Sequence, residues 1–196
     1  STHSLRPEGS RAFASILFDQ SRMKKLGTLL LVLLLFLGCR KERGERVFEM
    51  LYPNFTFTLP SGLSPFTAPT FAFNNESTSI DLYLQQNNTD TSAISAINPF
   101  SAQITALNNT AFDFLDEISV RICPAGIVQC DAFDEAFYLD NMRNRVYTQI
   151  ELLPSLRNFK PLLSGKAYRV EVVFKMNDFT PVTIDCKFDM SFEAIR

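Results

Sequence analysis

Tryptophan is absent from the 196-residue sequence, histidine occurs once, at His3, and glycine occurs only seven times. Four glycines follow residue 40, too few for the Gly-rich loops that hold nucleotide phosphates. Beyond His3, no Ser-His or Cys-His pair can form for nucleophilic catalysis, and a zinc site of Cys and His ligands is not expected. We therefore predict no catalytic residues and no cofactor, while a Ser-Lys or two-carboxylate site stays open.

Basic residues are also scarce. From residue 40 onward, 14 Lys plus Arg stand against 19 Asp plus Glu, a net charge of 14 − 19 = −5. The only block of basic residues lies within 40–46. Because nucleic-acid binding depends on neutralising phosphates, we predict no nucleic-acid partner.

One long apolar run is present, from Leu29 to Leu37. Met23-Lys24-Lys25 precedes it and Gly38-Cys39 follows it, the order of charge, apolar run and small residue that is typical of a secretory signal. The alternative is a transmembrane anchor, which needs roughly 20 apolar residues. The run from Leu26 to Gly38 has 13 residues before charges resume, which favours the signal.

The end of this run, Phe36-Leu37-Gly38-Cys39, resembles the lipobox of bacterial lipoproteins. The resemblance implies that Cys39 is lipidated and becomes the first mature residue. It also implies a membrane partner, held through the N-terminal lipid, and a location in the cell envelope, at the outer membrane or the cell surface. Lys41-Glu42 is similar to the start of a surface-export signal, and an ordinary solvated tether is the alternative.

These features divide the chain into four segments. Residues 1–22 precede the first methionine and are interpreted as a spurious or extended leader, and residues 23–38 as the signal peptide. Residues 39–50 are charged and have no apolar period, so we expect a mobile, lipid-anchored tether. Residues 51–196 are expected to form one domain.

Alternation with period two dominates residues 51–196, as in strands with one buried face. No long segment shows the 3.6-residue period of a helix, although 154–161 can hold one helical turn. We predict an all-β domain, an antiparallel, immunoglobulin-like β-sandwich of about eight or nine strands with a phenylalanine-rich core. The alternating segments are Phe55–Leu59, Phe71–Phe73, Ile80–Leu84, Phe100–Ala106, Phe112–Ile122, Val146–Leu152, Tyr168–Met176 and Val182–Phe192.

From Asn98 onward, the order of strands resembles the β-sandwich domains of uncharacterised small bacterial lipoproteins. Phe112–Ile122 and the closing pair Tyr168–Met176 and Val182–Phe192 carry this resemblance. The resemblance implies a fold and no known activity.

Three cysteines remain once Cys39 carries a lipid. Cys123 and Cys130 bracket a segment with proline and glycine that can bend back, and Cys186 alternates with apolar residues of a strand. In an oxidising compartment we predict a disulfide between Cys123 and Cys130, with Cys186 buried and reduced. The absence of any disulfide is the alternative.

An acidic loop follows these cysteines. Asp131, Asp134, Glu135 and Asp140 carry oxygen ligands that calcium accepts. Their spacing does not match the EF-hand, and charged loops are usually solvated, so we predict no metal site.

The sequence therefore predicts a lipid-anchored envelope protein whose β-sandwich is a non-catalytic binding or structural module. A glycan or an envelope protein is the expected ligand. The alternative is a small lipoprotein enzyme of the carboxylate type, such as a glycan hydrolase.

Overall fold

The computed structural model describes residues 44–142 and 146–196, so the signal segment and Cys39 lie outside the described residues. Gly44–Arg196 form a compact unit by themselves. Among the described residues, no helix is both long and apolar enough to cross a membrane.

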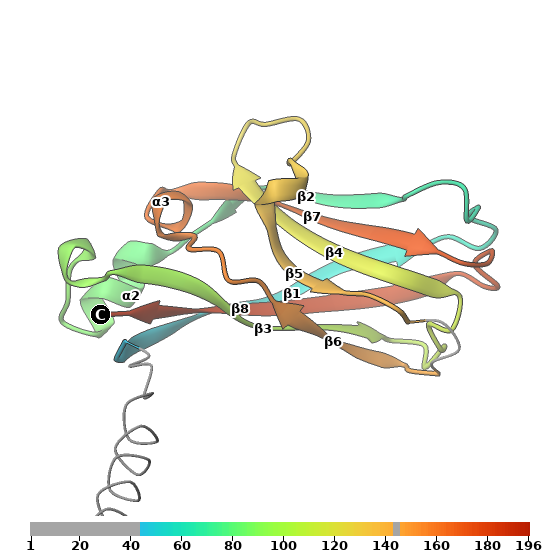
Figure 1. Cartoon of the computed structure of the whole chain (residues 1–196), viewed down its shortest axis with the longest axis horizontal. Helices are drawn as coiled ribbons and strands as arrows, with labels where there is room; N and C mark the ends of the chain where they lie inside the picture. Colours follow the sequence, from blue (N-terminus) through green and yellow to red (C-terminus); the bar gives the residue numbers. More distant parts are fainter. Residues whose placement is uncertain (1–43, 143–145) are drawn as a thin grey trace, which may run out of the picture. The chain divides into compact units, whose positions relative to one another are not determined.

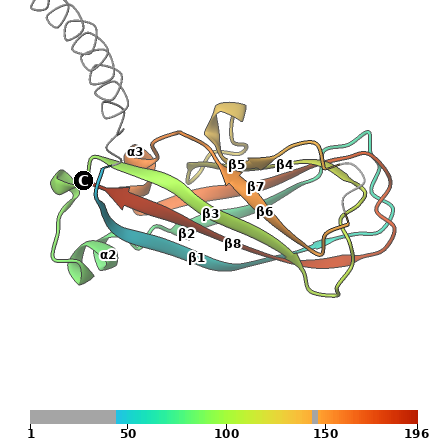
Figure 2. The same cartoon turned by 60° about the horizontal axis from the view of Figure 1, so that its bottom comes forward.

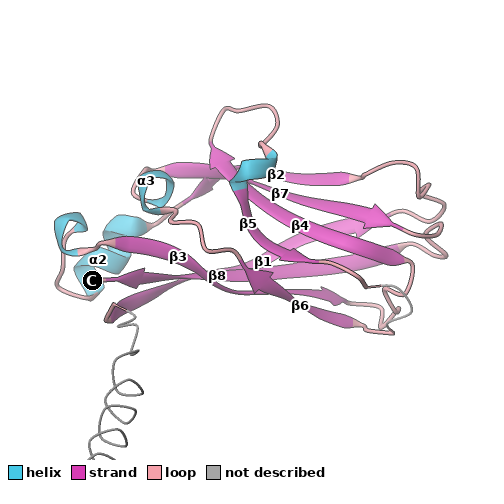
Figure 3. Ribbon diagram, viewed as in Figure 1, coloured by secondary structure: helices cyan, strands magenta, loops and turns pink. Residues whose placement is uncertain are grey.

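Strands account for most of the described chain (Figure 3). The elements are β1 (Arg46–Leu59), β2 (Thr70–Ser77), α2 (Ile80–Gln86), η1 (Thr91–Ala93), β3 (Ala96–Ala106), β4 (Leu115–Pro124), η2 (Ala132–Asp134), β5 (Glu135–Leu139), β6 (Gln149–Pro154), α3 (Lys160–Leu163), β7 (Ala167–Met176) and β8 (Ile184–Ile195). All their pairings are antiparallel, so the all-β prediction is confirmed, with eight strands in the described residues.

The strands follow the order β1-β8-β3-β6-β5-β4-β7-β2. We call β1-β8-β3-β6 the first face and β5-β4-β7-β2 the second face. Figures 1 and 2 show β1, β8 and β3 in one layer and β2, β7 and β4 in the other. A short pairing of Phe137 with Pro154 and Tyr138 with Leu153 joins the faces through β5 and β6.

The immunoglobulin-like order is not confirmed. In an immunoglobulin domain the first two strands are neighbours in one sheet. Here β1 and β2 lie at opposite ends of the order. The pairs β1–β8, β2–β7, β3–β6 and β4–β5 instead match the chain's first half with its second half in reverse.

Aromatic side chains fill the space between the two faces. The rings of Tyr52 and Tyr168 have centroids 5.4 Å apart, and those of Phe137 and Phe192 are 5.5 Å apart, each pair joining one face to the other. Phe188 on β8 is fully buried and Lys187 is partly exposed, which confirms the predicted register of this strand. One apolar core therefore supports both faces.

Two segments differ from the prediction. The alternating stretch at 80–84 is a helix, α2, because Ile80 and Leu84, four residues apart, both reach the core. The expected tether at 39–50 overlaps β1, which begins at Arg46 and buries Phe48 and Met50 against β8. Two inward residues place Arg46–Met50 in the sheet, although the charges of this stretch predicted mobility.

Candidate functional site

The first face carries an open hollow on its outward side, which we call the outer groove. It has a volume of about 470 Å³ and crosses all four strands of that face, which lie side by side in Figure 2. Its lining consists of Leu51, Tyr52, Pro53, Phe100, Ser101, Ala102, Gln103, Glu151, Leu152, Asp189, Met190 and Ser191.

A β-bulge in β3 supplies the aromatic side of the groove. Pro99 pairs with Phe192 and Ser101 pairs with Ser191, which leaves Phe100 as an extra residue. A bulge re-aims side chains, and Phe100 is 41% exposed rather than buried. The prediction that Phe100 shares the inward face of Ala102 is therefore wrong, because alternation does not continue through a bulge.

Two more residues of β1 complete this apolar end. Leu51 is 59% exposed, although its neighbours Met50 and Tyr52 are buried. The guanidinium carbon of Arg46 lies 4.3 Å from the centroid of the Phe100 ring, a cation–π contact at the rim. The groove thus offers an aliphatic side chain and an aromatic ring to solvent.

A row of polar side chains forms the other end. Gln103 on β3 pairs in register with Glu151 on β6 and with Asp189 on β8. Because neighbouring strands are about 4.8 Å apart, the two carboxylate-bearing residues stand about 10 Å apart across the row. In the part of the chain that the structure describes, the side chains of Gln103 and Glu151 form no hydrogen bond or ion pair.

Asp189 and the serines beside it are held in place. Asp189 accepts a hydrogen bond from the backbone N–H of Asn54 at 2.8 Å and forms an ion pair with Lys187 at 3.0 Å. The hydroxyls of Ser101 and Ser191 are hydrogen-bonded at 2.8 Å. The floor of the groove is therefore preorganised, while Gln103 and Glu151 keep their polar atoms available for a ligand.

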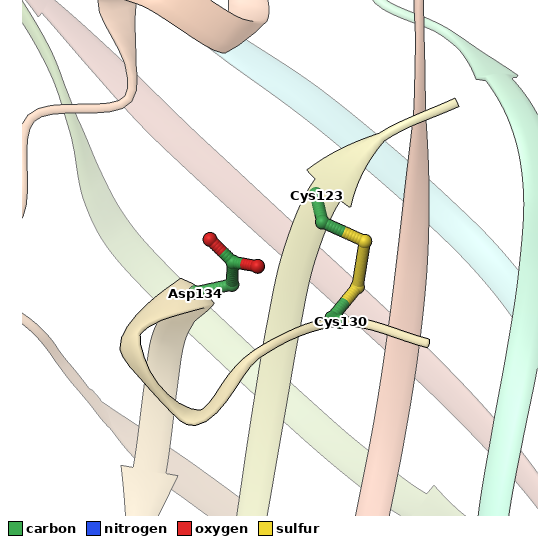
Figure 4. Close-up of side chains that lie close together, drawn as sticks. All are labelled: Cys123, Cys130 and Asp134. Atoms are coloured by element: carbon green, nitrogen blue, oxygen red, sulfur yellow. A yellow bond between two sulfur atoms is a disulfide. The ribbon is translucent and has the colours of Figure 1, made fainter. Parts of the chain in front are cut away.

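The predicted disulfide residues lie elsewhere, on the second face. Cys123 at the end of β4 and Cys130 form a disulfide with Cα atoms 5.5 Å apart, and Cys186 is a buried free thiol. The loop between Cys123 and Cys130 turns at Gly126, whose φ of 92° suits glycine. Figure 4 shows the disulfide with Asp134 beside it.

The acidic loop residues do not converge on one point. Asp131 and Asp134 cap η2 reciprocally, and Asp134 also forms an ion pair with Arg157 at 2.9 Å. Glu135 accepts a hydrogen bond from the hydroxyl of Ser119 at 2.6 Å, and Asp140 is exposed beyond β5.

Asp134 also lies within 4.8 Å of both cysteine sulfurs, the one grouping of potential metal ligands among the described residues. The sulfurs are bonded to each other in the disulfide, so neither can act as the thiolate that binds a metal. This group is not a metal site.

The groove residues were missed by sequence reasoning. They come from four strands that are far apart in the chain, and pairing alone brings them together. The available signal was the proline before Phe100, because a proline inside a strand often marks a bulge.

An all-β domain with an open groove is a class that hosts many functions. No family model matches the chain, and no curated protein matches it. A solved structure titled Desmodium yellow mottle tymovirus is similar at 12% sequence identity and a TM-score of 0.31, over 80% of this chain and 92% of that chain. A likeness at this TM-score supports no conclusion about this protein.

Proposed function

We propose that the protein is held in the cell envelope by a lipid on Cys39 and that its β domain is a non-catalytic module that binds an extended glycan. The observation that carries the binding proposal is the outer groove, with its exposed ring and its row of polar side chains. Sugar rings have C–H faces that pack on aromatic rings and hydroxyls that bond to carboxylates and amides. Small molecules usually bind in enclosed pockets. An open groove across four strands is therefore a better fit for a chain of sugars than for a small molecule.

The envelope part of the proposal is supported by the signal-like segment and the residues Phe36–Cys39. β1 begins at Arg46, seven positions after Cys39 (46 − 39 = 7). Seven residues reach at most about 25 Å, so a lipid on Cys39 would hold the domain close to the membrane surface. The proposed module would then act at the membrane and not at the end of a long stalk.

We also propose a finer architecture. The two faces form a sandwich, and the pairing of the chain's first half with its second half in reverse supports jelly-roll connectivity. An immunoglobulin-like connectivity would need β1 and β2 to be hydrogen-bonded neighbours.

A second candidate function has one specific observation in its favour. The backbones of Glu151 and Asp189 are about 10 Å apart, a spacing from which the two side chains could bring their carboxyl groups to the roughly 6.5–9.5 Å separation of inverting glycan hydrolases. A general acid in such enzymes sits in a desolvated pocket. Glu151 is exposed and the side chain of Asp189 is 29% exposed, so we favour binding without cleavage.

The test is a glycan array probed with the full chain, in a detergent that carries no sugar, followed by product analysis. We expect retention of an oligosaccharide without new reducing ends. Phe100→Ala should abolish retention, and Phe66→Ala, which removes another exposed ring outside the groove, should not. Release of reducing sugar that stops in Glu151→Gln would support the hydrolase, and no retention of any glycan would overturn both.

A further inference from the structure

The two edge strands of the sheet face each other along a seam. β1 and β2 end the strand order and are not hydrogen-bonded to each other. Ring contacts close the seam instead, with centroids 5.0 Å apart for Phe55 and Phe73 and 4.7 Å apart for Phe57 and Phe71. The seam is therefore sealed by side chains at one end.

Beside these rings the seam opens into a second hollow of about 440 Å³, which we call the seam cleft. The register of β1 shifts between Tyr52 and Phe55, and that of β2 shifts between Phe73 and Glu76. Asn54 and Asn75 inside these shifts have φ values of 69° and 60°. Two facing irregularities thus keep the edge strands apart at this point.

One residue that lines the seam cleft carries an unsatisfied buried hydroxyl. Tyr168 lines the cleft and is fully buried, and within residues 44–142 and 146–196 its hydroxyl has no hydrogen-bond partner. Tyr52 lines the same cleft, but its hydroxyl donates to the carbonyl of Thr78 at 2.7 Å. Buried polar groups in proteins are almost always paired, so the Tyr168 hydroxyl calls for a partner that the described residues do not supply.

Glu76 is the charged residue of this cleft, and no Lys or Arg of the described residues lines it. Burial raises the pKa of Tyr168, and the neighbouring Tyr52 and Glu76 raise it further, so Glu76 acts electrostatically on the unpaired hydroxyl. The Tyr168 hydroxyl therefore stays protonated and needs an acceptor, whereas the Glu76 carboxylate accepts from a donor.

We propose that the seam cleft binds one sugar unit, with a ligand hydroxyl that accepts from Tyr168 and donates to Glu76. A hydroxyl both donates and accepts, whereas an ammonium only donates and a phosphate would be repelled by Glu76. The rings of Phe55 and Phe73 in the wall suit the C–H face of a sugar. This inference deepens the glycan-binding function proposed above and rests on it for the class of ligand.

The two hollows also adjoin. Leu51, Tyr52 and Pro53 line both the outer groove and the seam cleft, so β1 alone separates them. A glycan chain in the groove can therefore place an end or branch over this strand into the cleft.

The test is calorimetric titration of the full chain, in a detergent free of sugar and ammonium groups, with methyl glycosides of glucose, galactose, mannose and N-acetylglucosamine. Choline and inorganic phosphate serve as comparison probes. We expect one glycoside to bind, and Tyr168→Phe and Glu76→Gln each to weaken it about tenfold, the loss of one hydrogen bond. Glu45→Gln, an exposed carboxylate outside both hollows, should leave binding unchanged.

The Phe100→Ala variant distinguishes binding in the seam cleft from binding in the outer groove. Phe100→Ala should abolish retention of oligosaccharides and leave the binding of the methyl glycoside intact, so either site can fail alone. Binding of choline or phosphate in place of a glycoside would overturn the inference. So would a melt in which Tyr168→Phe changes the midpoint while no glycoside binds, because the hydroxyl would then hold only a buried water.

Discussion

The two faces of the β domain share one core, but their outer surfaces differ in how their polar side chains are paired. On the second face, Arg169 holds the buried Glu171 at 2.8 Å, and the backbone N–H of Cys130 in the disulfide loop donates to the same carboxylate at 3.1 Å. On the first face, Gln103 and Glu151 leave their side-chain atoms to solvent. The paired carboxylate of Glu171 therefore stabilises the second face, whereas the binding proposed above uses the solvent-facing side chains of Gln103 and Glu151 on the first.

The largest expected effect tests whether the shared core supports the two faces equally. Phe188 on β8 and Phe174 on β7 are both fully buried, so Phe188→Ala and Phe174→Ala should each lower the free energy of unfolding by about 3–5 kcal/mol. Lys187→Ala should change it by less than about 0.5 kcal/mol. Denaturant melts measure all three. A Phe188→Ala midpoint equal to that of Lys187→Ala would contradict a core between the faces.

The alternation of hydrophobic residues predicted this core because it is unbroken in β8, and a slip of one residue would expose every apolar side chain. The same signal failed at α2, where Ile80, Leu82 and Leu84 fit a strand and a helix equally well over so short a stretch. It also failed at Phe100, since a bulge shifts the register without any change in composition. The outer groove depends on which strands are neighbours, and alternation carries no information about pairing.

The next prediction compares one glutamate from each face. Glu171→Ala should lower the free energy of unfolding by about 3 kcal/mol, because it leaves the largely buried Arg169 without its carboxylate. Glu151→Ala, at an exposed position of the first face, should stay within about 0.5 kcal/mol. Thermal or denaturant melts of the two variants decide this. Equal losses would remove the distinction between the faces.

The disulfide of the second face should contribute somewhat less. Its cysteines are 7 positions apart, and a cross-link closing so short a loop stabilises by about 2–3 kcal/mol in the chain-entropy account. The double variant Cys123→Ser and Cys130→Ser should unfold at a lower denaturant concentration by that amount. Glycan retention, which we propose for the first face, should be unchanged. Loss of retention in this folded variant would show that the faces do not act separately.

A further prediction concerns Cys186, on the inner side of the first face. Burial, and then the charge of Asp185, raises the pKa of the Cys186 thiol to about 12. The unfolded thiol ionises near pH 8.5, so its contribution is complete below that pH and is lost as pH rises toward 12. Unfolding measured from pH 8 to pH 11 should show this decline in the wild type and less of it in Cys186→Ala.

The thiols can be counted in the same samples. Iodoacetamide at pH 8 should label no thiol in the folded domain, because Cys186 is buried and protonated. After unfolding without reductant, one of the three cysteines beyond Cys39 should react. Labelling of three would contradict the disulfide.

The hydroxyl of Tyr83 on α2 occupies the open edge of β1. It accepts a hydrogen bond from the N–H of Leu51 at 2.9 Å and donates one to the carbonyl of Leu51 at 3.1 Å. Two residues further on, Pro53 has no N–H to offer a neighbouring strand. A long exposed edge is a template for fibre growth, above all where many copies crowd together. Tyr83 and Pro53 leave no free N–H for another strand at these positions, so neighbouring copies of the protein cannot extend one another's sheets through this stretch of β1.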